Sequence, residues 1–449
     1  MPTRPSRLRW LLAVAGALLA LSTAAPAAAG ERSAPCERLV TSTADSGPGS
    51  LRGALAAAGA SSGPCTVRFD SVHGPFAEPQ TITLQGELPP LGGTLVLDGT
   101  IAERLWVATG VTLSGGGRLR VLRVLPGARV TLKSLTIAQG RSGRGGGILN
   151  AGALAVVGVT FVGNVAAGDG GAIATTGGTL KVVNSTFAGN RAGRRGGGVA
   201  HLGGEAAVGN CTFSGNRAAS GGALFTRGGL LLRNTILTGS AAGRDCVASR
   251  PIDPRSTHNL IIANGGCGTP LLTADPRLEK LGAYNGPTAV FPLGGGSPAI
   301  NMGDNAAAVD EEGHRLVWDQ RGNGDPRFVA GFTDIGAFEV QAFPVLTVNS
   351  PEDTGLRACT GAGASDCSLR GAIELATASG KPQVIRFDPR VFSRSPVVTV
   401  GRPLPAAAAE ITLDGSGTPG IVVRFLAAAL PRPGGLHFTL RRVTFAAGE

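Results

Sequence analysis

The order of apolar and polar positions repeats with a nearly fixed period between Gly145 and Ser240. A glycine-rich phrase ending in an aliphatic residue begins at Gly145, Gly170, Gly196 and Gly221, so its spacing is nearly constant. A second phrase, TFxGN, begins at Thr160, Thr186 and Thr212, which are equally spaced. Because the two phrases keep the same phase, we expect each repeat to form one coil of a solenoid.

The apolar runs inside each repeat are short and are separated by Gly/Asn clusters, as in 172–174 and 180–187. None is long enough for a helix with a 3.6-residue period, so the coils are predicted to consist of strands. Short strands joined by glycine turns and stacked about 4.8 Å apart form a parallel β-helix. The predicted fold class is therefore all-β.

Equivalent positions of successive coils should lie directly above one another. The expected columns are an aromatic stack of Phe161, Phe187 and Phe213, an aliphatic column of Ile148, Ile173, Val199 and Leu224, and an amide ladder of Asn164, Asn190 and Asn216. Stacked amides bond to the layers above and below them. The asparagines are thus predicted to be structural rather than ligand-binding.

A short helix is predicted at Leu51–Ala58, with Ser50 as its N-cap and Gly59 as its C-cap. Strands are expected after it at 66–70, 81–84, 94–99, 111–113, 119–125 and 130–137. An open end of a β-helix exposes unpaired strand edges, so a helix at this place is expected to cap the coils. Arg52 on that helix is expected to be a solvated or capping charge.

The last part of the chain repeats the first. GSLRGAL at Gly49–Leu55 matches CSLRGAI at Cys367–Ile373, and TVRFD at 66–70 matches VIRFD at 384–388. A second β-helix is therefore predicted to begin near Val345. It reaches Glu449 where the first copy enters its glycine coils, so we expect this unit to continue in a longer chain.

Specific phrases between these copies resemble known families. The DPRL, NGPT, GSPAI, DQRG and DIGAFE phrases at 275–339 resemble the choice-of-anchor Q domain of bacterial surface proteins, and CSLRGAIELA resembles the CSLREA domain. The glycine and FxGN phrases resemble the repeats of polymorphic outer-membrane proteins. Gly371 and Gly49 depart from the CSLREA pattern, which has Glu and Cys there. The resemblance implies a right-handed parallel β-helix at the cell surface, without established catalytic activity.

Residues 1–29 have the pattern of a secretory signal peptide, with three arginines before a short apolar core. We expect the mature chain to be extracellular or at the cell surface and to have no membrane span. The predicted regions are 1–29, the signal peptide; 30–240, the first cap and β-helix; 241–343, the choice-of-anchor Q-like region; and 344–449, the second cap and incomplete β-helix. Of the 449 residues 71 are Gly, about twice the usual share, which suits a chain with many turns.

Seven cysteines in an exported chain favour disulfides. The pairs nearest in sequence are Cys36 with Cys65, Cys246 with Cys267, and Cys359 with Cys367. Cys211 is left over and stands where Ser185 stands one coil earlier, so it is expected to be a buried, unreactive thiol.

Polysaccharide-cleaving enzymes are a second class for a β-helix. Glycoside hydrolysis needs two carboxylates facing one bond, but the only acids at 141–240 are Asp169 and Glu205, whose separation is out of phase with the repeat. The acid-rich run at 304–334 could offer Ca²⁺ ligands, but it has no regular ligand spacing, and turn-capping and solvated loop charges are the favoured explanation. His201 is expected to point outward. No catalytic residue, metal site or cofactor other than this possible calcium is predicted.

Arginines follow the FxGN phrases. Arg191 and Arg217 stand one period apart and should stack, with Arg194 and Arg195 beside them. Stacked like charges repel, and the formal net charge is +11, so an anionic partner is favoured. No nucleic-acid partner is predicted. Solubilising turn residues are the alternative. The first hypothesis is a non-enzymatic surface protein that binds an anionic polysaccharide or envelope polymer; the alternative is a pectin-lyase-like lyase or hydrolase, and the oligomeric state is undetermined.

Overall fold

The computed structural model describes residues 36–100, 110–322, 324–329, 331–341, 346–359, 365–379, 383–405, 411–415, 417–429 and 438–447. The predicted signal peptide, residues 1–29, lies outside these ranges. Within them, no helix is both long and apolar enough to cross a membrane. Apart from the α-helices, only short 3₁₀ turns at Pro75–Ala77, Asn305–Ala307 and Ala427–Ala429 are helical in the described residues.

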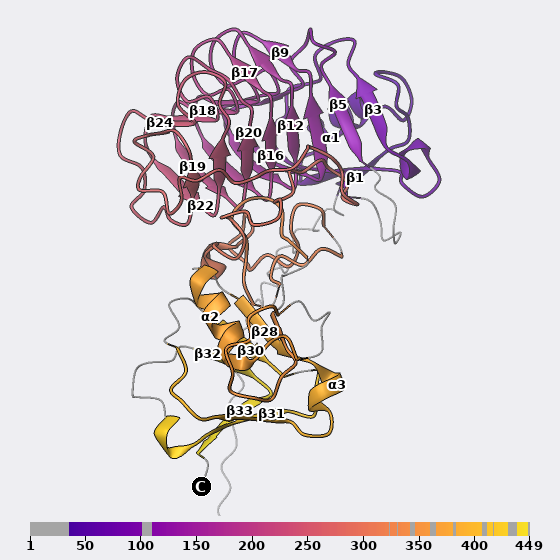
Figure 1. Cartoon of the computed structure of the whole chain (residues 1–449). Coiled ribbons are helices and arrows are strands. Elements are labelled where there is room, and N and C mark those ends of the chain that lie inside the picture. The colour runs from indigo at the N-terminus through magenta and orange to yellow at the C-terminus, as the bar shows by residue number, and fades with distance from the viewer. Residues whose placement is uncertain are drawn as a thin grey trace, which may run out of the picture. The chain divides into compact units, whose positions relative to one another are not determined.

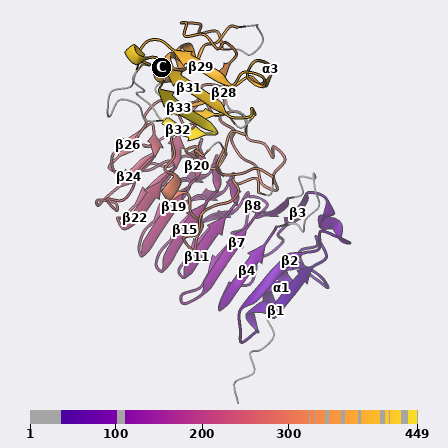
Figure 2. The ribbon, with the colours of Figure 1, turned by 90° about the horizontal axis from the view of Figure 1, so that it is seen from below.

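The chain forms a parallel β-helix, as predicted. Successive coils contribute strands to three long parallel sheets, A, B and C, and some coils add a short strand to sheet D. Sheet A consists of β1 (Cys36–Val40), β2 (Cys65–Phe69), β4 (Thr94–Asp98), β7 (Arg129–Lys133), β11 (Ala153–Val157), β15 (Thr179–Val183), β19 (Glu205–Gly209) and β22 (Leu230–Arg233). Figure 2 shows the strands of sheet A side by side in this order.

The other sheets follow the same stacking (Figure 1). Sheet B consists of β3 (Gln80–Thr83), β5 (Val111–Ser114), β8 (Leu135–Ala138), β12 (Thr160–Val162), β16 (Thr186–Ala188), β20 (Thr212–Ser214), β23 (Ile236–Thr238) and β25 (Leu260–Ile261). Sheet C consists of β6 (Leu122–Val124), β10 (Ile148–Asn150), β14 (Ile173–Thr175), β18 (Val199–His201), β21 (Leu224–Thr226), β24 (Cys246–Ala248) and β26 (Asn264–Gly265). Sheet D consists of β9 (Arg141–Ser142), β13 (Val165–Ala166) and β17 (Arg191–Ala192), so it lies between sheets B and C along each coil.

The interior columns lie where the repeat places them. The rings of Phe161 and Phe187 stack with centroids 4.7 Å apart, and those of Phe187 and Phe213 with centroids 4.2 Å apart. Ile148, Ile173, Val199 and Leu224 are paired in register across sheet C. The side-chain amide of Asn164 donates to Asn190 Oδ1 at 2.9 Å, and that of Asn190 to Asn216 Oδ1 at 3.0 Å. A continuous core is thus built from residues that no single coil could bury.

Helix α1 (Leu51–Gly59) packs its apolar face, including Leu51 and Leu55, into the core of the first coils. Ser50 caps its start by accepting a hydrogen bond from the backbone of Gly53. The helix extends one residue further than predicted, and its C-cap is Ala60 rather than Gly59. Because Ala60 has ordinary right-handed backbone angles, the helix ends without the left-handed glycine that the prediction assumed.

Arg52 on α1 connects three parts of this end of the β-helix. Its guanidinium contacts the Asp45 carboxylate at 2.7 Å and donates to the backbone oxygens of Gly86 and Glu87. Arg52, expected to be a solvated or capping charge, is therefore a partly buried link between the helix and two loops. Such charge-assisted bonds to fixed acceptors hold a helix in one orientation.

The C-terminal residues build a second set of parallel coils. One sheet consists of β27 (Leu346–Val348), β28 (Gln383–Phe387), β30 (Ile411–Asp414) and β32 (Phe438–Arg441); the other consists of β29 (Val397–Val400), β31 (Ile421–Phe425) and β33 (Val443–Ala447). Helices α2 (Leu369–Ser379) and α3 (Pro389–Phe392) pack on their core. Arg370 on α2 contacts Asp353 at 2.7 Å and donates to the backbone of Arg402 and Pro403, which repeats the arrangement around Arg52.

Candidate functional site

A column of arginines runs along sheet D. Arg141, Val165 and Arg191 are register partners on β9, β13 and β17, and Arg191 also pairs with Arg217 of the next coil. The three arginines are exposed, and so is Arg194 in the adjoining turn. Among the described residues, none of these four side chains makes an ion pair. We call Arg141, Arg191, Arg194 and Arg217 the arginine ridge.

Arg195 differs from the other three arginines predicted to form the site. Its guanidinium lies 2.8 Å from the carboxylate of Asp169, which is fully buried, and it also stacks over the ring of Phe225. Arg144, one coil on the other side of Asp169, lies 3.7 Å from the same carboxylate. The hydrogen bond from Arg195 holds the pKa of Asp169 below its usual value. Arg195 is therefore a structural partner of Asp169, and the ridge does not include it.

The repeat itself contains the signal for this pair. Asp169 precedes Arg195 by one period, so the two occupy the same place in neighbouring coils. The pair of Asp169 and Arg195 was not predicted, because Asp169 was compared only with Glu205, the other acid of these coils. Applying the period to charges of opposite sign would have found it.

The described residues of 275–341, which we call the docking segment, cover the outer side of sheet B. The side chain of Gln320 accepts a hydrogen bond from Thr186 at 2.6 Å and donates to Thr160 at 2.9 Å. The backbone N–H of Ala337 donates to the hydroxyl of Thr212 at 3.0 Å. The threonines of the three TFxGN phrases, all buried, are thus a docking column for this segment. The periodicity predicted their strands but not this role.

A second column fixes the docking segment at the corner between sheets A and B. Asn184, Asn210 and Asn234 have positive φ angles, which asparagine tolerates better than most residues. Asn184 donates to the backbone oxygen of Trp318 at 2.8 Å, and Asn234 donates to that of Asp304 at 2.9 Å. The docking segment is therefore bound through side chains that the coils present at fixed intervals.

The DQRG and DIGAFE phrases form a buried cluster of charges inside the docking segment. Arg321 contacts Asp319 at 2.6 Å and Asp325 at 2.8 Å. Arg327 is fully buried and donates to the Thr333 hydroxyl at 2.9 Å. Glu339, also fully buried, lies 3.7 Å from Arg327, too far for a hydrogen bond. Asp304 and Asp310 accept backbone hydrogen bonds in turns, as expected of turn-capping charges. Asp319 and Asp334 also accept backbone hydrogen bonds, but they are buried and are therefore not solvated loop charges.

No three His, Cys, Asp or Glu side chains of the described residues are arranged to hold a metal ion. Three acids of the docking segment, of which only Glu312 is exposed, lie beside a groove of ≈ 230 Å³ on sheet A. One wall carries Asp310, Glu311 and Glu312, and Lys181 of the floor donates to the backbone oxygen of Glu311 at 2.6 Å. His314 lies 3.5 Å from both Asp310 and Glu312.

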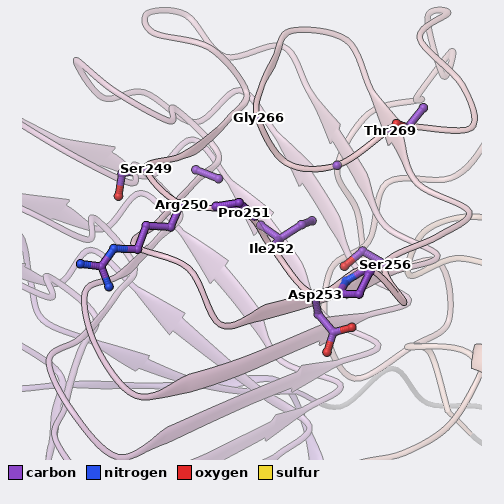
Figure 3. Close-up of a pocket in the computed structure, with 11 residues that line it drawn as sticks. Ser249, Arg250, Pro251, Ile252, Asp253, Ser256, Gly266 and Thr269 are labelled. Atoms are coloured by element: carbon purple, nitrogen blue, oxygen red, sulfur yellow. The ribbon is translucent and has the colours of Figure 1, made fainter.

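A larger cavity of ≈ 600 Å³ lies in the loop after β24 (Figure 3). Arg250, Ile252, Asp253 and Thr269 are among its lining residues. Arg255 contacts the carboxylate of Asp253 at 2.6 Å, and this hydrogen bond lowers the pKa of Asp253 to about 2. Asp253 is therefore ionised at neutral pH and is the wrong group to act as a general acid there.

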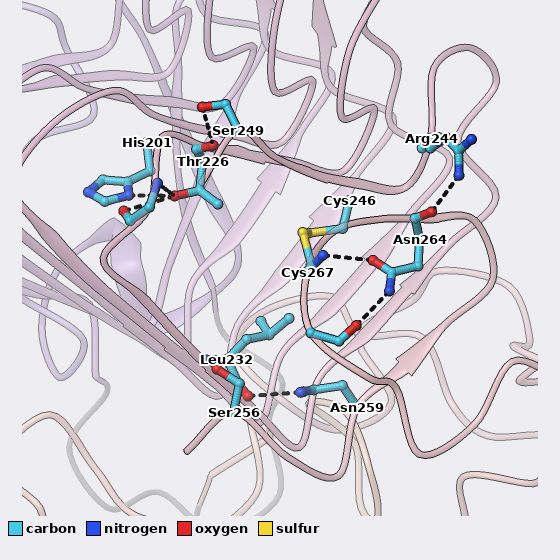
Figure 4. The surroundings of a disulfide bond; sticks show 12 residues. His201, Thr226, Leu232, Arg244, Cys246, Ser249, Ser256, Asn259, Asn264 and Cys267 are labelled. Atoms are coloured by element: carbon cyan, nitrogen blue, oxygen red, sulfur yellow. Dashed lines mark hydrogen bonds between the residues drawn. A yellow bond between two sulfur atoms is a disulfide. The ribbon is translucent and has the colours of Figure 1, made fainter. Parts of the chain in front are cut away.

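His201 points into the coils, contrary to the prediction. It is buried and bonded to the Thr226 hydroxyl at 2.9 Å and to the Gly204 backbone oxygen at 3.1 Å (Figure 4). Its register partners Asn150, Thr175 and Thr226 are buried as well. The polar residues at this position of other coils suggested a surface site. They are buried instead, because side chains of this column form hydrogen bonds between coils. Burial lowers the pKa of His201.

The cysteines are joined as Cys36–Cys65, Cys246–Cys267 and Cys359–Cys367. Figure 4 shows the second bond beside Asn264, whose side chain accepts a hydrogen bond from the backbone of Cys267 at 2.9 Å. The free Cys211 is fully buried, and burial raises its pKa to about 12. Its thiol is therefore protonated at neutral pH and inaccessible, as a structural cysteine should be.

Comparison with known proteins finds similarity in the glycine coils. The family model of the Chlamydia polymorphic membrane protein repeat matches residues 158–176 and 210–227. No curated protein and no solved structure matches the chain. Each matched stretch includes one TFxGN phrase and the glycine phrase after it. Sequence comparison therefore identifies in two coils the repeat that the structure stacks into a parallel β-helix.

Proposed function

We propose that this chain is an exported, surface-associated, non-enzymatic β-helix protein that binds an anionic polysaccharide or envelope polymer along the arginine ridge. The choice-of-anchor Q-like docking segment and the CSLREA-like caps are structural parts in this proposal. The observation that carries it is the pairing of Arg191 with Arg217 in adjacent coils, both exposed and without an ion-pair partner among the described residues.

The electrostatic repulsion between the ridge arginines supports a partner outside the protein. Two guanidinium groups on neighbouring coils repel each other, and the nearest buried carboxylate, Asp169, is already bonded to Arg195. An anionic polymer would remove this repulsion and form charge-assisted hydrogen bonds. Sheet B cannot offer an equivalent surface because the docking segment covers it.

Two features support export and surface association. Three disulfides favour an oxidising compartment, since thiols stay reduced in the cytosol. The matched repeat is named for a polymorphic membrane protein, and a similar location is proposed for this chain.

The test is a binding screen of the protein against acidic and neutral glycans, with and without calcium. A variant with Arg191→Ser, Arg194→Ser and Arg217→Ser should lose most of its retention on the acidic ligands. The matched control carries Arg38→Ser, Arg129→Ser and Arg227→Ser, which removes the same charge from exposed arginines of other sheets and turns. Equal losses of retention in both triple variants would show that binding depends on the net charge of the protein and not on the arginine ridge.

The same screen addresses the alternative of a polysaccharide-cleaving enzyme. Each bound polymer is assayed for new reducing ends and for unsaturated products. Cleavage would overturn the non-enzymatic proposal and would make Asp310, Glu312 and His314 beside the sheet A groove the first residues to replace.

A further inference from the structure

The arginine ridge has a register that restricts its ligand. Arg141, Val165, Arg191 and Arg217 occupy one column, with a single residue from each of four successive coils. Neighbouring coils are about 4.8 Å apart, so the column spans about 14 Å parallel to the axis of the β-helix. Three of the four positions carry a positive charge, and the second carries a valine.

The adjoining column has a different charge pattern. Arg144, Asp169 and Arg195 alternate in sign, and the two arginines both lie near the Asp169 carboxylate, at 3.7 and 2.8 Å. Charge in this column is therefore partly neutralised within the protein. The Arg141 column has no carboxylate within ion-pair distance among the described residues, so it is the column open to an external anion.

We infer that the arginine ridge binds a linear acidic polysaccharide lying parallel to the β-helix axis, with one carboxylate per sugar and one sugar per coil, and that Val165 is a gap in this register. The inference rests on the proposed function and names its ligand class. The coil spacing is close to the length of one pyranose residue in an extended uronic acid chain. Successive carboxylates of such a chain do not all point to one side, so the long arginine side chains would reach those that face the ridge and those beside it, with the donor geometry that suits a carboxylate.

The gap allows a gain-of-function test. Val165 is half-buried and aligned with Arg141 and Arg191, so Val165→Arg should complete a row of four cations. The control Ala167→Arg adds the same charge to an exposed turn position of the same coil, outside the column. Val165→Gln provides a long uncharged side chain at the gap, and a thermal melt of each variant verifies that the coils remain folded.

The probes are galacturonate oligomers of increasing length and polygalacturonate, with inorganic polyphosphate and dextran sulfate as anions of other spacing. Wild-type affinity for galacturonates should rise steeply up to about four sugars, because the column spans four coils. Val165→Arg should tighten binding of the longer oligomers about threefold to tenfold and should steepen the salt dependence by roughly one released counterion. Val165→Gln and Ala167→Arg should each change the affinity less than twofold.

Equally tighter binding by Val165→Arg and Ala167→Arg would overturn the inference, since it would show that binding depends on the added charge and not on its position in the column. Preference for polyphosphate or dextran sulfate over polygalacturonate would also overturn it. In both cases loss of binding in the ridge triple variant would leave the proposed function standing. If the wild-type protein retains none of these polymers, the proposed function fails as well.

Discussion

Gln320 and Thr186 are joined by a hydrogen bond of 2.6 Å, although they lie far apart in the chain. The same Gln320 side chain reaches Thr160 and Thr288, so one amide connects two coils with the docking segment. All four side chains are buried. The bond therefore stabilises the contact only while every partner is present, because an unpaired buried polar group is costly.

Replacement of Gln320 by Leu should loosen the docking segment. The hydroxyl of Thr186 would lose its acceptor, whereas the hydroxyl of Thr160 would keep its bond to the Ala289 backbone oxygen, so the cost should be about 1 to 3 kcal/mol. Hydrogen exchange should then increase across residues 275–341 while sheet D keeps its protection. Gln85→Leu, on an exposed side chain, is the control. Unchanged exchange in Gln320→Leu would show that the segment is held by other contacts.

The buried acids of the docking segment predict a dependence of stability on pH. Burial raises the pKa of Asp334 to about 6, and burial followed by repulsion from Asp334 raises the pKa of Glu339 well above its usual value. The charge of Arg327 opposes both shifts but does not cancel the effect of burial. A carboxyl with a raised folded-state pKa contributes stability below its unfolded pKa and loses it as pH rises through the folded value.

The melting temperature of the wild-type protein should therefore fall between pH 5 and pH 8. It should also fall below about pH 4, where carboxylates with lowered pKa values, such as Asp45 and Asp353, become protonated. Glu339→Gln keeps the shape of the side chain and cannot ionise, so its melting temperature should change less between pH 5 and pH 8. A parallel pH profile in the two proteins would contradict the role given to Glu339.

Asn190 lies in the middle of the amide ladder, and its side chain is bonded to both neighbouring asparagines. It accepts from the backbone and side chain of Asn164 and donates to Asn216 and to the Phe161 oxygen. Asn190→Ala should lower the free energy of unfolding by about 3 to 5 kcal/mol, because it leaves buried groups without partners. Chemical denaturation measures this. The double variant with Asn216→Ala should cost less than the sum of the single changes, since the two share one bond.

The sequence predicts the coils better than it predicts what surrounds them. A fixed period places Phe187 above Phe161 and Asn190 above Asn164, because equivalent residues of stacked coils must meet. The partner of Thr186 is Gln320, and no period relates these two positions. The irregular docking segment therefore has contacts that the repeat could not reveal, and Asp334 was predicted to be a loop charge although it is buried.

The residues of the candidate site were likewise predicted only in part. The period places Arg191 beside Arg217, and it also contains the Asp169–Arg195 pair, which was missed because only like charges were aligned. His201 was misplaced for another reason. Its column carries Asn and Thr in other coils, and polarity was taken for exposure, whereas inter-coil hydrogen bonds allow all of these residues to be buried.

Asp169 allows a last prediction in which stability and binding change in opposite directions. Its fully buried carboxylate pairs with Arg195 at 2.8 Å, and Arg144 lies 3.7 Å away. Asp169→Asn keeps the size of the side chain but removes the charge, so two arginines lose their counterion. The free energy of unfolding should fall by roughly 2 to 3 kcal/mol, less than for a fully buried pair because Arg195 remains partly exposed.

The same change raises the positive charge beside the arginine ridge, so the proposed function predicts tighter binding of polygalacturonate at low salt. The control is Glu205→Gln, which removes the other acid of the glycine coils at an exposed position on β19 of sheet A. It should leave both stability and binding nearly unchanged. Denaturation curves and salt titrations of the three proteins separate the two effects, and weaker binding by folded Asp169→Asn would mean that Asp169 orders the ridge for its ligand rather than neutralising it.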